Sequence, residues 1–180
     1  MKTIEEVYVK QIYNEIADQF NNTRVYTWSW IRNFINKVPK NGFIYDIGCG
    51  NGRNMISQNH TMIGIDNCEK FIEMCRNKNK LVILNEITNI SLPDNSADAI
   101  ICIAVIHHLS TNELRLKALL EIKRLIKPKC KILISVWSIN QPPKTKITFE
   151  KYGDNFIKWN HKQIRYYYLY KINEIKLLFI

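Results

Sequence analysis

Residues 43–52 read FIYDIGCGNG and are the most informative part of the sequence. An apolar run leads into Asp46, after which Gly48, Gly50 and Gly52 alternate with other residues. The pattern is typical of a buried strand that ends in a glycine-rich loop, with a helix beginning after the loop. Because glycine has no Cβ, the backbone of such a loop can come very close to a ligand. The stretch therefore predicts a ligand site at the carboxyl end of a strand.

The ligand class follows from a second strand. Residues 62–66, MIGID, are apolar and end in Asp66, eighteen positions after Gly48. A carboxylate at that distance can accept hydrogen bonds from a ribose diol, as the acidic residue of dinucleotide-binding folds does. The glycine spacing is G-x-G-x-G rather than the G-x-G-x-x-G of those folds. The combination favours S-adenosylmethionine (SAM), and the alternatives are a nucleotide or a glycine turn that binds nothing.

Composition predicts a single globular domain. The chain has 180 residues, of which 46% are hydrophobic, enough to build a substantial core. No apolar run approaches the ~18 residues that a membrane span needs, so we expect no membrane association, and the N-terminus is unlike a secretory signal. The five cysteines are odd in number and form no C-x-x-C pair. They indicate a reducing compartment and no metal site.

The charge is uneven along the chain. The net charge is +10, and residues 141–180 hold eight Lys or Arg against three acids. Eight Phe, Tyr or Trp residues are interleaved with these cations between 149 and 170. Basic groups attract phosphates and aromatic faces stack on unpaired bases, so RNA is a plausible partner. A solvated basic face is the alternative that charge alone leaves open.

The remaining pattern alternates helices and strands, which predicts an α/β fold with a doubly wound, mostly parallel sheet and ligands at the carboxyl ends of its strands. Ser110 with Glu113 forms a capping-box pattern, and Pro128 ends the helix that follows. The helix after Gly52 must be small, because Thr61 follows within nine residues. The other expected elements are amphipathic helices at 7–20 and 28–38, a helix at 67–77, and strands at 81–84, 97–105 and 131–137.

Three further clusters lie where this fold would place an active site. His107 and His108 follow the fourth strand, Trp137 ends the fifth, and Arg24 lies between the two N-terminal helices, which could cover the pocket as a lid. Each has an ordinary alternative when taken alone. A histidine pair is more often structural, a tryptophan is usually core, and a lone arginine is usually a surface charge.

Together these segments resemble the tRNA methyltransferases that esterify carboxymethyluridine at the wobble position, including the methyltransferase part of the animal AlkB-type tRNA hydroxylase. The glycine loop is generic to class I SAM-dependent methyltransferases, whereas IAVIHHLST and RYYYLY are more specific. The segments that carry the resemblance are YNEIADQFNNTR (13–24), DIGCGNG (46–52), IGID (63–66), IAVIHHLST (103–111), VWSINQ (136–141) and IRYYYLY (164–170).

The resemblance implies a class I methyltransferase (Rossmann-like) α/β fold, SAM as the cofactor, and 5-carboxymethyluridine in a tRNA anticodon loop as the substrate. It implies that cofactor contacts come from Asp46, Gly48, Gly50, Asp66, Ile103 and Ala104. Glu86 is the nearest fit for the adenine contact, with Thr88 as the alternative. The implied catalytic, substrate-facing residues are Arg24, His107, Trp137, Arg165 and Tyr166. Arg24 or Arg165 would clamp the substrate carboxylate, because a guanidinium can hold a carboxylate through two hydrogen bonds.

The resemblance also implies a partner, a small zinc-binding activator subunit that pairs with the sheet edge near residues 81–87. We divide the single domain into N-terminal helices (1–40), a cofactor-binding core (41–137) and a basic, aromatic segment (138–180). Family members continue into a helix and two closing strands. Residues 171–180, KINEIKLLFI, are expected to supply the start of that helix, and the two closing strands are expected to be missing. We expect a cytoplasmic location, with the nucleus as a further one. A small-molecule methyltransferase and a catalytically silent binding protein remain the competing interpretations.

Overall fold

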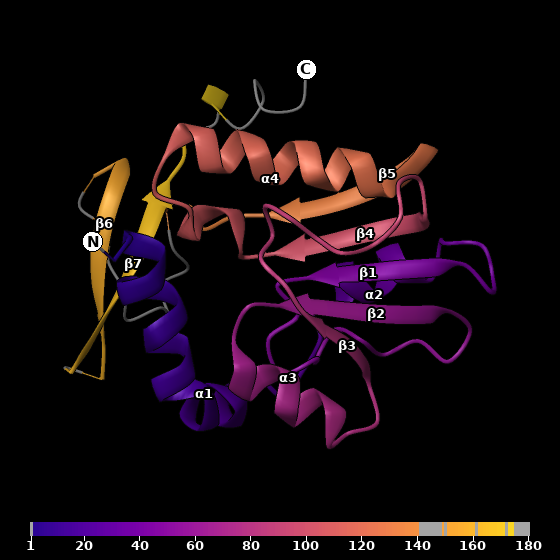
Figure 1. Cartoon of the computed structure of the whole chain (residues 1–180), viewed down its shortest axis with the longest axis horizontal. Helices are drawn as coiled ribbons and strands as arrows, with labels where there is room; N and C mark the ends of the chain where they lie inside the picture. The colour runs from indigo at the N-terminus through magenta and orange to yellow at the C-terminus, as the bar shows by residue number, and fades with distance from the viewer. Residues whose placement is uncertain (1, 141–148, 150, 161, 172, 175–180) are drawn as a thin grey trace.

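A computed structural model describes residues 2–140, 149, 151–160, 162–171, 173 and 174. Its centre is a five-stranded sheet in which every paired neighbour is parallel, in the order β3-β2-β1-β4-β5. The strands are β1 (Phe43–Ile47), β2 (Thr61–Asp66), β3 (Leu81–Leu84), β4 (Ala97–Ile103) and β5 (Ile126–Ser135). The predicted α/β architecture is confirmed, and β3 and β5 are the edges of this sheet in the part of the chain that is described (Figure 1).

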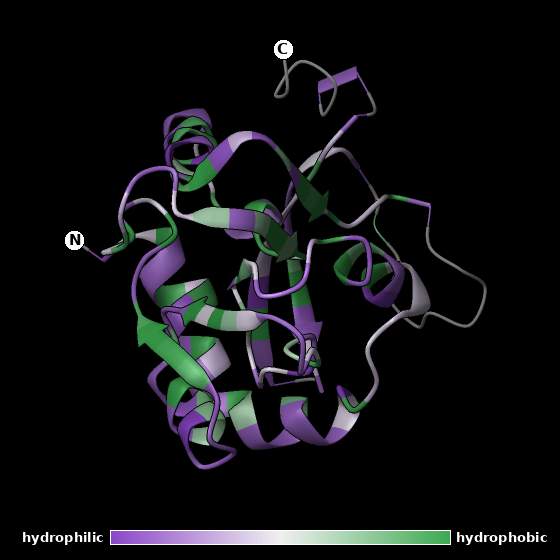
Figure 2. Ribbon diagram, turned by 90° about the vertical axis from the view of Figure 1, so that its right-hand side faces the viewer, coloured by the Kyte–Doolittle hydropathy of each residue, from purple (hydrophilic) through white to green (hydrophobic). Residues whose placement is uncertain are grey.

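Helices cover both faces of the sheet. α4 (Asn112–Leu125) packs its apolar residues against one face, together with the inward side chains of β1 and β4. α2 (Ser29–Ile35) and α3 (Glu69–Arg76) contribute Ile31, Ile35 and Cys75 to the core on the other face. Apart from Asp98, β4 is apolar and buried, as expected of a strand that lies between two helical layers. Figure 2 shows the resulting pattern, with apolar residues along the strands and alternating hydropathy along the helices.

The N-terminal helix and a C-terminal hairpin stand at the carboxyl ends of the strands. The predicted helix over 7–20 is continuous, a π-helical segment η1 (Glu6–Lys10) followed by α1 (Gln11–Thr23). β6 (Gly153–Trp159) and β7 (Gln163–Leu169) form a separate antiparallel pair. In Figure 1, β7 and α1 lie beyond the arrowheads of the central strands. The ligand site predicted at this edge of the sheet is therefore walled by both termini of the domain.

The structure corrects four expectations about individual elements. The glycine loop does not open a helix, because residues 53–60 run through turns and bends into β2, and α2 covers that face instead. The cap of α4 is Thr111, not Ser110, since the Thr111 hydroxyl accepts from the Leu114 N–H at 3.2 Å. The strand predicted to reach residue 105 ends at Ile103, because Ala104 turns into the left-handed region at φ 61°. β5 begins at Ile126, so Pro128 lies in an extended segment.

The 138–180 segment is only partly described. Lys144, Lys146 and Lys176 of the predicted basic stretch, and most of the helix expected after the RYYYLY motif, lie outside the described residues. The motif itself forms β7. No helix among the described residues has the length and apolar character to cross a membrane.

Candidate active site

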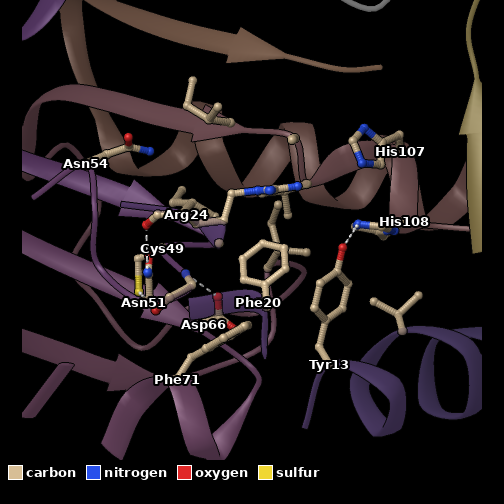
Figure 3. A pocket seen from close by; sticks show the side chains of 18 of the residues that line it. Tyr13, Phe20, Arg24, Cys49, Asn51, Asn54, Asp66, Phe71, His107 and His108 are labelled. Atoms are coloured by element: carbon tan, nitrogen blue, oxygen red, sulfur yellow. Dashed lines mark hydrogen bonds between the residues drawn. The ribbon is translucent and has the colours of Figure 1, made fainter. Parts of the chain in front are cut away.

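A cavity of about 1030 Å³ lies at the carboxyl ends of β1, β2 and β4, between the sheet, α1 and β7. That volume exceeds the usual range for one small ligand, so a cofactor and an acceptor group can lie in it together. Figure 3 shows Asp66 toward one side of it and the histidine pair toward the other. Its lining includes predicted residues of both groups: Arg24, Gly48, Gly50, Asp66, Glu86, Ile103, Ala104, His107, Trp137 and Arg165.

The glycine loop forms one wall of the cavity. Gly48, at φ 71°, packs so tightly on the side chain of Val105 that an added Cβ would collide with it. Around Gly50, at φ 54°, an added Cβ would meet only the Phe20 ring, at 3.9 Å. The first glycine is thus required by packing and by backbone conformation, and the second leaves a backbone surface open to a ligand.

Asp46 is a fully buried carboxylate beneath this loop. Neither of its oxygens has a hydrogen-bond partner among the described residues. Burial, and to a smaller extent the charge of Asp66, raise the pKa of Asp46 to about 7, with Arg53 and Lys80 partly opposing the rise. A buried acceptor without donors is costly, so the site suits a ligand that brings a cation or N–H groups. The methionine ammonium of SAM has that chemistry.

Asp66 and Glu86 lie at the ends of neighbouring strands. Asp66 accepts from the Gly50 N–H at 2.8 Å and from the Cys68 N–H at 2.9 Å, which fixes its carboxylate against the glycine loop. Burial raises the pKa of Asp66, and these backbone bonds work against the rise. Each oxygen keeps an acceptor position that a ribose hydroxyl could use. Of the two adenine candidates, Glu86 lines the cavity and Thr88 does not.

The far side of the cavity is held by a chain of hydrogen bonds. Arg165 on β7 donates from Nη1 to the Tyr13 hydroxyl at 3.2 Å. That hydroxyl lies 3.0 Å from His108 Nε2 (Figure 3). The other ring nitrogen, His108 Nδ1, donates to the Tyr166 carbonyl at 2.8 Å. With Nδ1 as the donor, Nε2 must accept from Tyr13. Burial lowers the pKa of His108 to about 3, so the imidazole is neutral and acts as a structural link between α1 and β7.

His107 has a different environment. Its Nδ1 accepts from the Trp137 N–H at 3.2 Å, so Nε2 carries the proton of the neutral ring, and this N–H has no partner among the described residues. Burial, with the neighbouring His108 and Arg165, holds the pKa of His107 well below its usual value. The ring lies 5.1 Å from that of Tyr167. His107 can therefore donate a hydrogen bond but is poorly suited to accept a proton.

The two arginines proposed as carboxylate clamps differ in burial. Arg165 is only 1% exposed, lies over the rings of Trp159 and Tyr167, and forms no ion pair within the described ranges. Its Nε–H is also without a partner there. Arg24 caps the end of α1, and its guanidinium lies 4.9 Å from the centre of the Phe20 ring. Arg165 is thus a buried, uncompensated cation beside the cavity, which an anionic ligand would neutralise.

Three predicted residues do not line the cavity. Asp46 lies beneath it, and Thr88 is excluded from it. Tyr166 was predicted to face the substrate, and the structure corrects this. Side chains alternate across a strand, so β7 presents Arg165 and Tyr167 to the cavity. The Tyr166 hydroxyl instead donates to Asp154 on β6, at 2.5 Å.

The sequence reasoning missed Tyr13 and Tyr167 as members of the site. Period-two alternation from Arg165 would have selected Tyr167 in place of Tyr166. Tyr13 stands at the start of the 13–24 segment, and only the packing of α1 against β7 brings its hydroxyl to Arg165 and His108. No local pattern could have indicated that contact.

Comparison with known proteins identifies the family. The model of a methyltransferase domain matches residues 45–134. A tRNA (carboxymethyluridine(34)-5-O)-methyltransferase of Schizosaccharomyces pombe is 34% identical over 175 residues, which cover 96% of this chain and 76% of that protein. This chain belongs to the tRNA carboxymethyluridine methyltransferase family. The mouse (Mus musculus) relative ALKBH8 is 38% identical over 144 residues, which cover 79% of this chain but only 22% of that protein. The chain therefore spans about a fifth of the length of the mouse protein it matches.

Solved structures support the fold. A SAM-dependent methyltransferase from Methanosarcina mazei has a TM-score of 0.70 at 17% identity, covering 85% of this chain and 82% of that one. A methyltransferase structure described as a complex with the Trm112 methyltransferase activator of Haloferax volcanii has a TM-score of 0.57 at 13% identity. That match covers 72% of this chain and 60% of the other. The fold of this family member is thus that of class I SAM-dependent methyltransferases.

Proposed function

We propose that this chain transfers the methyl group of SAM to the carboxylate of 5-carboxymethyluridine at wobble position 34 of tRNA, giving the methyl ester. Family membership supports the reaction class. The open backbone at Gly50, the unpartnered oxygens of Asp46 and the carboxylate of Asp66 fit the cofactor. The observation that carries the substrate assignment is Arg165, a buried cation at the acceptor side of the cavity that has no acidic partner in the described part of the chain.

The proposed reaction requires little proton transfer by protein side chains. The sulfonium of SAM supplies an electrophilic methyl group. A carboxylate is ionised near neutral pH, so a carboxylate oxygen forms the new C–O bond as the methyl–sulfur bond breaks, and S-adenosylhomocysteine leaves. No base is needed, which agrees with the low pKa of His107 and the structural role of His108. The residues act by orienting the acceptor and excluding water.

Arg165, His107 and the aromatic walls would share that orientation. Arg165 offers N–H groups to the carboxylate, and the free Nε2–H of His107 offers another donor on the same side. Trp137 and Tyr167, with ring centres 5.2 Å apart, form an apolar wall against which a uracil ring can pack. Arg24 projects over Phe20 from the glycine-loop side, so it could reach either the acceptor or the methionine carboxylate.

The deciding experiment is methyl transfer from radiolabelled SAM to tRNA that lacks the ester, with and without an activator subunit. We expect label on the tRNA that mild alkali releases, because an ester hydrolyses under those conditions and an N-methyl or C-methyl group does not. Label that resists alkali would refute the carboxylate acceptor. Absence of transfer while SAM binds would favour the silent or small-molecule interpretation.

The clamp is tested by Arg165→Gln and Arg24→Gln. For Arg165→Gln we expect a loss of turnover on tRNA of at least about 100-fold, since a charge-assisted bond to a buried carboxylate is worth ~1.5–3 kcal/mol and positioning is lost with it. SAM affinity should stay near wild type in Arg165→Gln. A fall in SAM affinity for Arg24→Gln alone would assign Arg24 to the cofactor. If both variants turn over like wild type, the clamp assignment is wrong.

We further propose that a small zinc-binding activator subunit covers the β3 edge. β3 pairs only with β2 among the described strands, so its other edge has unpaired backbone groups. Leu81 and Leu84 on this strand are 60% and 42% exposed. An apolar, pairable edge suits a partner that adds a strand.

A further inference from the structure

A second, smaller cavity of about 430 Å³ lies on the outer side of the glycine loop. Among the described residues that line it, Arg24, Arg53, Lys78 and Lys80 are cationic and none is Asp or Glu. The other lining residues include Asn21 and Asn22, whose amide nitrogens can donate hydrogen bonds. A concave site with this lining is suited to an anion rich in oxygen atoms.

The four cations lack acidic partners within the described part of the chain. Lys78 Nζ donates to Asn21 Oδ1 at 3.3 Å and to the Asn51 carbonyl at 3.4 Å, and Lys80 Nζ donates to the Met55 carbonyl at 2.7 Å. The Arg53 guanidinium lies 4.5 Å from the centre of the Trp28 ring. Burial and the nearby Arg24 both lower the pKa of Arg53, and the charge of Asp46 partly opposes this fall. Like charges are therefore crowded here, and the buried Asp46 offsets them only in part.

The small cavity adjoins the main one, because Arg24, Val25, Asn51 and Arg53 line both. Asn51 holds this shared wall in place, because its amide nitrogen donates to Asn21 Oδ1 and to the Arg24 carbonyl, each at 2.9 Å. A ligand with one group in the main cavity can thus place a neighbouring group in the small one.

An aromatic surface adjoins the same wall. Trp28 and Trp30 stack with ring centres 5.6 Å apart and planes 16° from parallel. They remain 46% and 41% exposed, and Tyr26 beside them is 84% exposed. Exposed aromatic faces beside cations are the features with which proteins bind unpaired bases and the backbone between them. An isolated phosphate ion would make no use of the tryptophan pair.

We propose that the small cavity binds a backbone phosphate of an unpaired RNA strand whose acceptor nucleoside lies in the main cavity, with a base of that strand stacked on the Trp28–Trp30 pair. The inference rests on the proposed function for the identity of the acceptor. Lys78 is the exposed member of the cationic set, and its ammonium contacts the phosphate together with Arg53.

The test uses an anticodon stem-loop RNA with a plain uridine at the acceptor position, so that binding is measured without methyl transfer. The variants are Lys78→Met, Lys78→Arg and Trp30→Leu. Lys117→Met is the matched control, because Lys117 is an exposed lysine on α4 outside the lining of both cavities. Affinity is measured at several salt concentrations, and SAM affinity and melting temperature are measured in parallel to show that each variant is folded.

We expect Lys78→Met to weaken RNA binding several-fold and to lower the slope of log affinity against log salt by about 0.7, the value for one phosphate contact in a single strand. Lys78→Arg should retain the wild-type RNA affinity and salt slope, and Lys117→Met should match wild type in both quantities. Trp30→Leu should weaken RNA binding with little change in the salt slope. The inference is overturned if Lys78→Met and Lys117→Met bind alike. A second result would also overturn the inference. If Trp30→Leu binds RNA with wild-type affinity, and inorganic phosphate competes with RNA only when Lys78 is present, the cavity is a site for a free anion.

Failure of this inference can be told apart from failure of the proposed function. If carboxymethyluridine is esterified and Lys78→Met binds and turns over RNA like Lys117→Met, only the phosphate site is wrong. If no ester forms but RNA binding depends on Lys78, only the proposed reaction is wrong.

Discussion

At the scale of single residues, the site is defined by polar groups that the protein does not satisfy by itself. Within the described residues, Asp46 has two buried oxygens without donors, and His107 and Arg165 each have a buried N–H without an acceptor. Buried polar groups are normally paired, so such exceptions call for an explanation. Asp46 is an acceptor beneath the cofactor side of the cavity, and the two donors belong to residues at the acceptor side. A cationic ammonium and a carboxylate would complete both ends.

Asp46 gives a pH-dependent prediction. Its pKa of about 7 in the ligand-free protein means that the carboxylate is mostly protonated at pH 6 and mostly ionised at pH 8. If the ionised form is the one that binds the ammonium of SAM, affinity should rise about tenfold between these values, with proton release at pH 6. Calorimetry in buffers of different ionisation enthalpy measures both. Asp46→Asn should bind more weakly with no such pH dependence, and an unchanged pH dependence in that variant would refute the assignment.

The same group predicts how stability varies with pH. The pKa of Asp46 is 3.8 when unperturbed and about 7 when folded, so between these values the folded protein holds a proton that the unfolded chain has lost. The free energy of unfolding gained from this group is therefore fully present below pH 4 and declines as pH rises toward 7. Denaturant titrations of ligand-free protein should show a shallower fall over this window in Asp46→Asn than in wild type. Equal slopes would show that Asp46 ionises normally.

The sequence located most of these residues but not all of their roles. Gly48, Gly50 and Asp66 are recognisable because a glycine loop and an acid after the next strand have a fixed geometric relation. The sequence analysis selected Tyr166, but Tyr167 is the tyrosine that lines the cavity. A family resemblance identifies the motif, whereas the alternation of side chains along β7 determines which of them face the cavity. The contact of Tyr13 with His108 joins residues 95 positions apart, which no local spacing reveals.

At the scale of elements, strands were the most predictable features. β1, β2 and β3 match their expected ranges within one residue, because turn residues on both sides of a short apolar run define where a strand begins and ends. The prediction of a helix after the glycine loop was wrong, since residues 53–60 run through turns and bends into β2. α2 replaces that helix on the same face, burying Ile31 and Ile35 against β1 and β2. Tertiary packing determines which helix covers a face of the sheet, and the local sequence pattern does not predict it.

The start of α4 provides an element-scale prediction. Thr111 caps this helix, with its hydroxyl accepting from the Leu114 N–H, whereas Ser110 donates only its backbone N–H, to Glu5 at 2.6 Å. Thr111→Ala should therefore lower the free energy of unfolding by about 1 kcal/mol. Ser110→Ala is the matched control and should change it by less than half as much. Thermal or urea unfolding of the two variants measures the difference, and the reverse order would return the cap to Ser110.

At the scale of the whole molecule, the cavity is assembled from segments that are distant in sequence. α1 and β7 lie against each other at the carboxyl edge of the sheet through Tyr13, Arg165 and His108 (Figure 1). The basic, aromatic C-terminal segment therefore contributes to the site as a wall rather than as an extended tail. Its hairpin supplies Arg165 and Tyr167, while the small cationic cavity comes from the N-terminal half. An RNA strand would contact both halves of the chain.

The exposed edge of the sheet leads to a prediction about assembly. β3 is an apolar edge strand with Leu81 60% exposed, and α4 carries Leu116, 55% exposed, away from that edge. Leu81→Lys should abolish co-purification with the proposed activator subunit, because a charge on a strand edge opposes strand addition. Leu116→Lys removes a similarly exposed leucine and should leave the complex intact. Both variants should bind SAM, since neither residue lines the cavity. Retention of the activator by Leu81→Lys and its loss in Leu116→Lys would place the interface on α4 and leave β3 as an unpartnered edge.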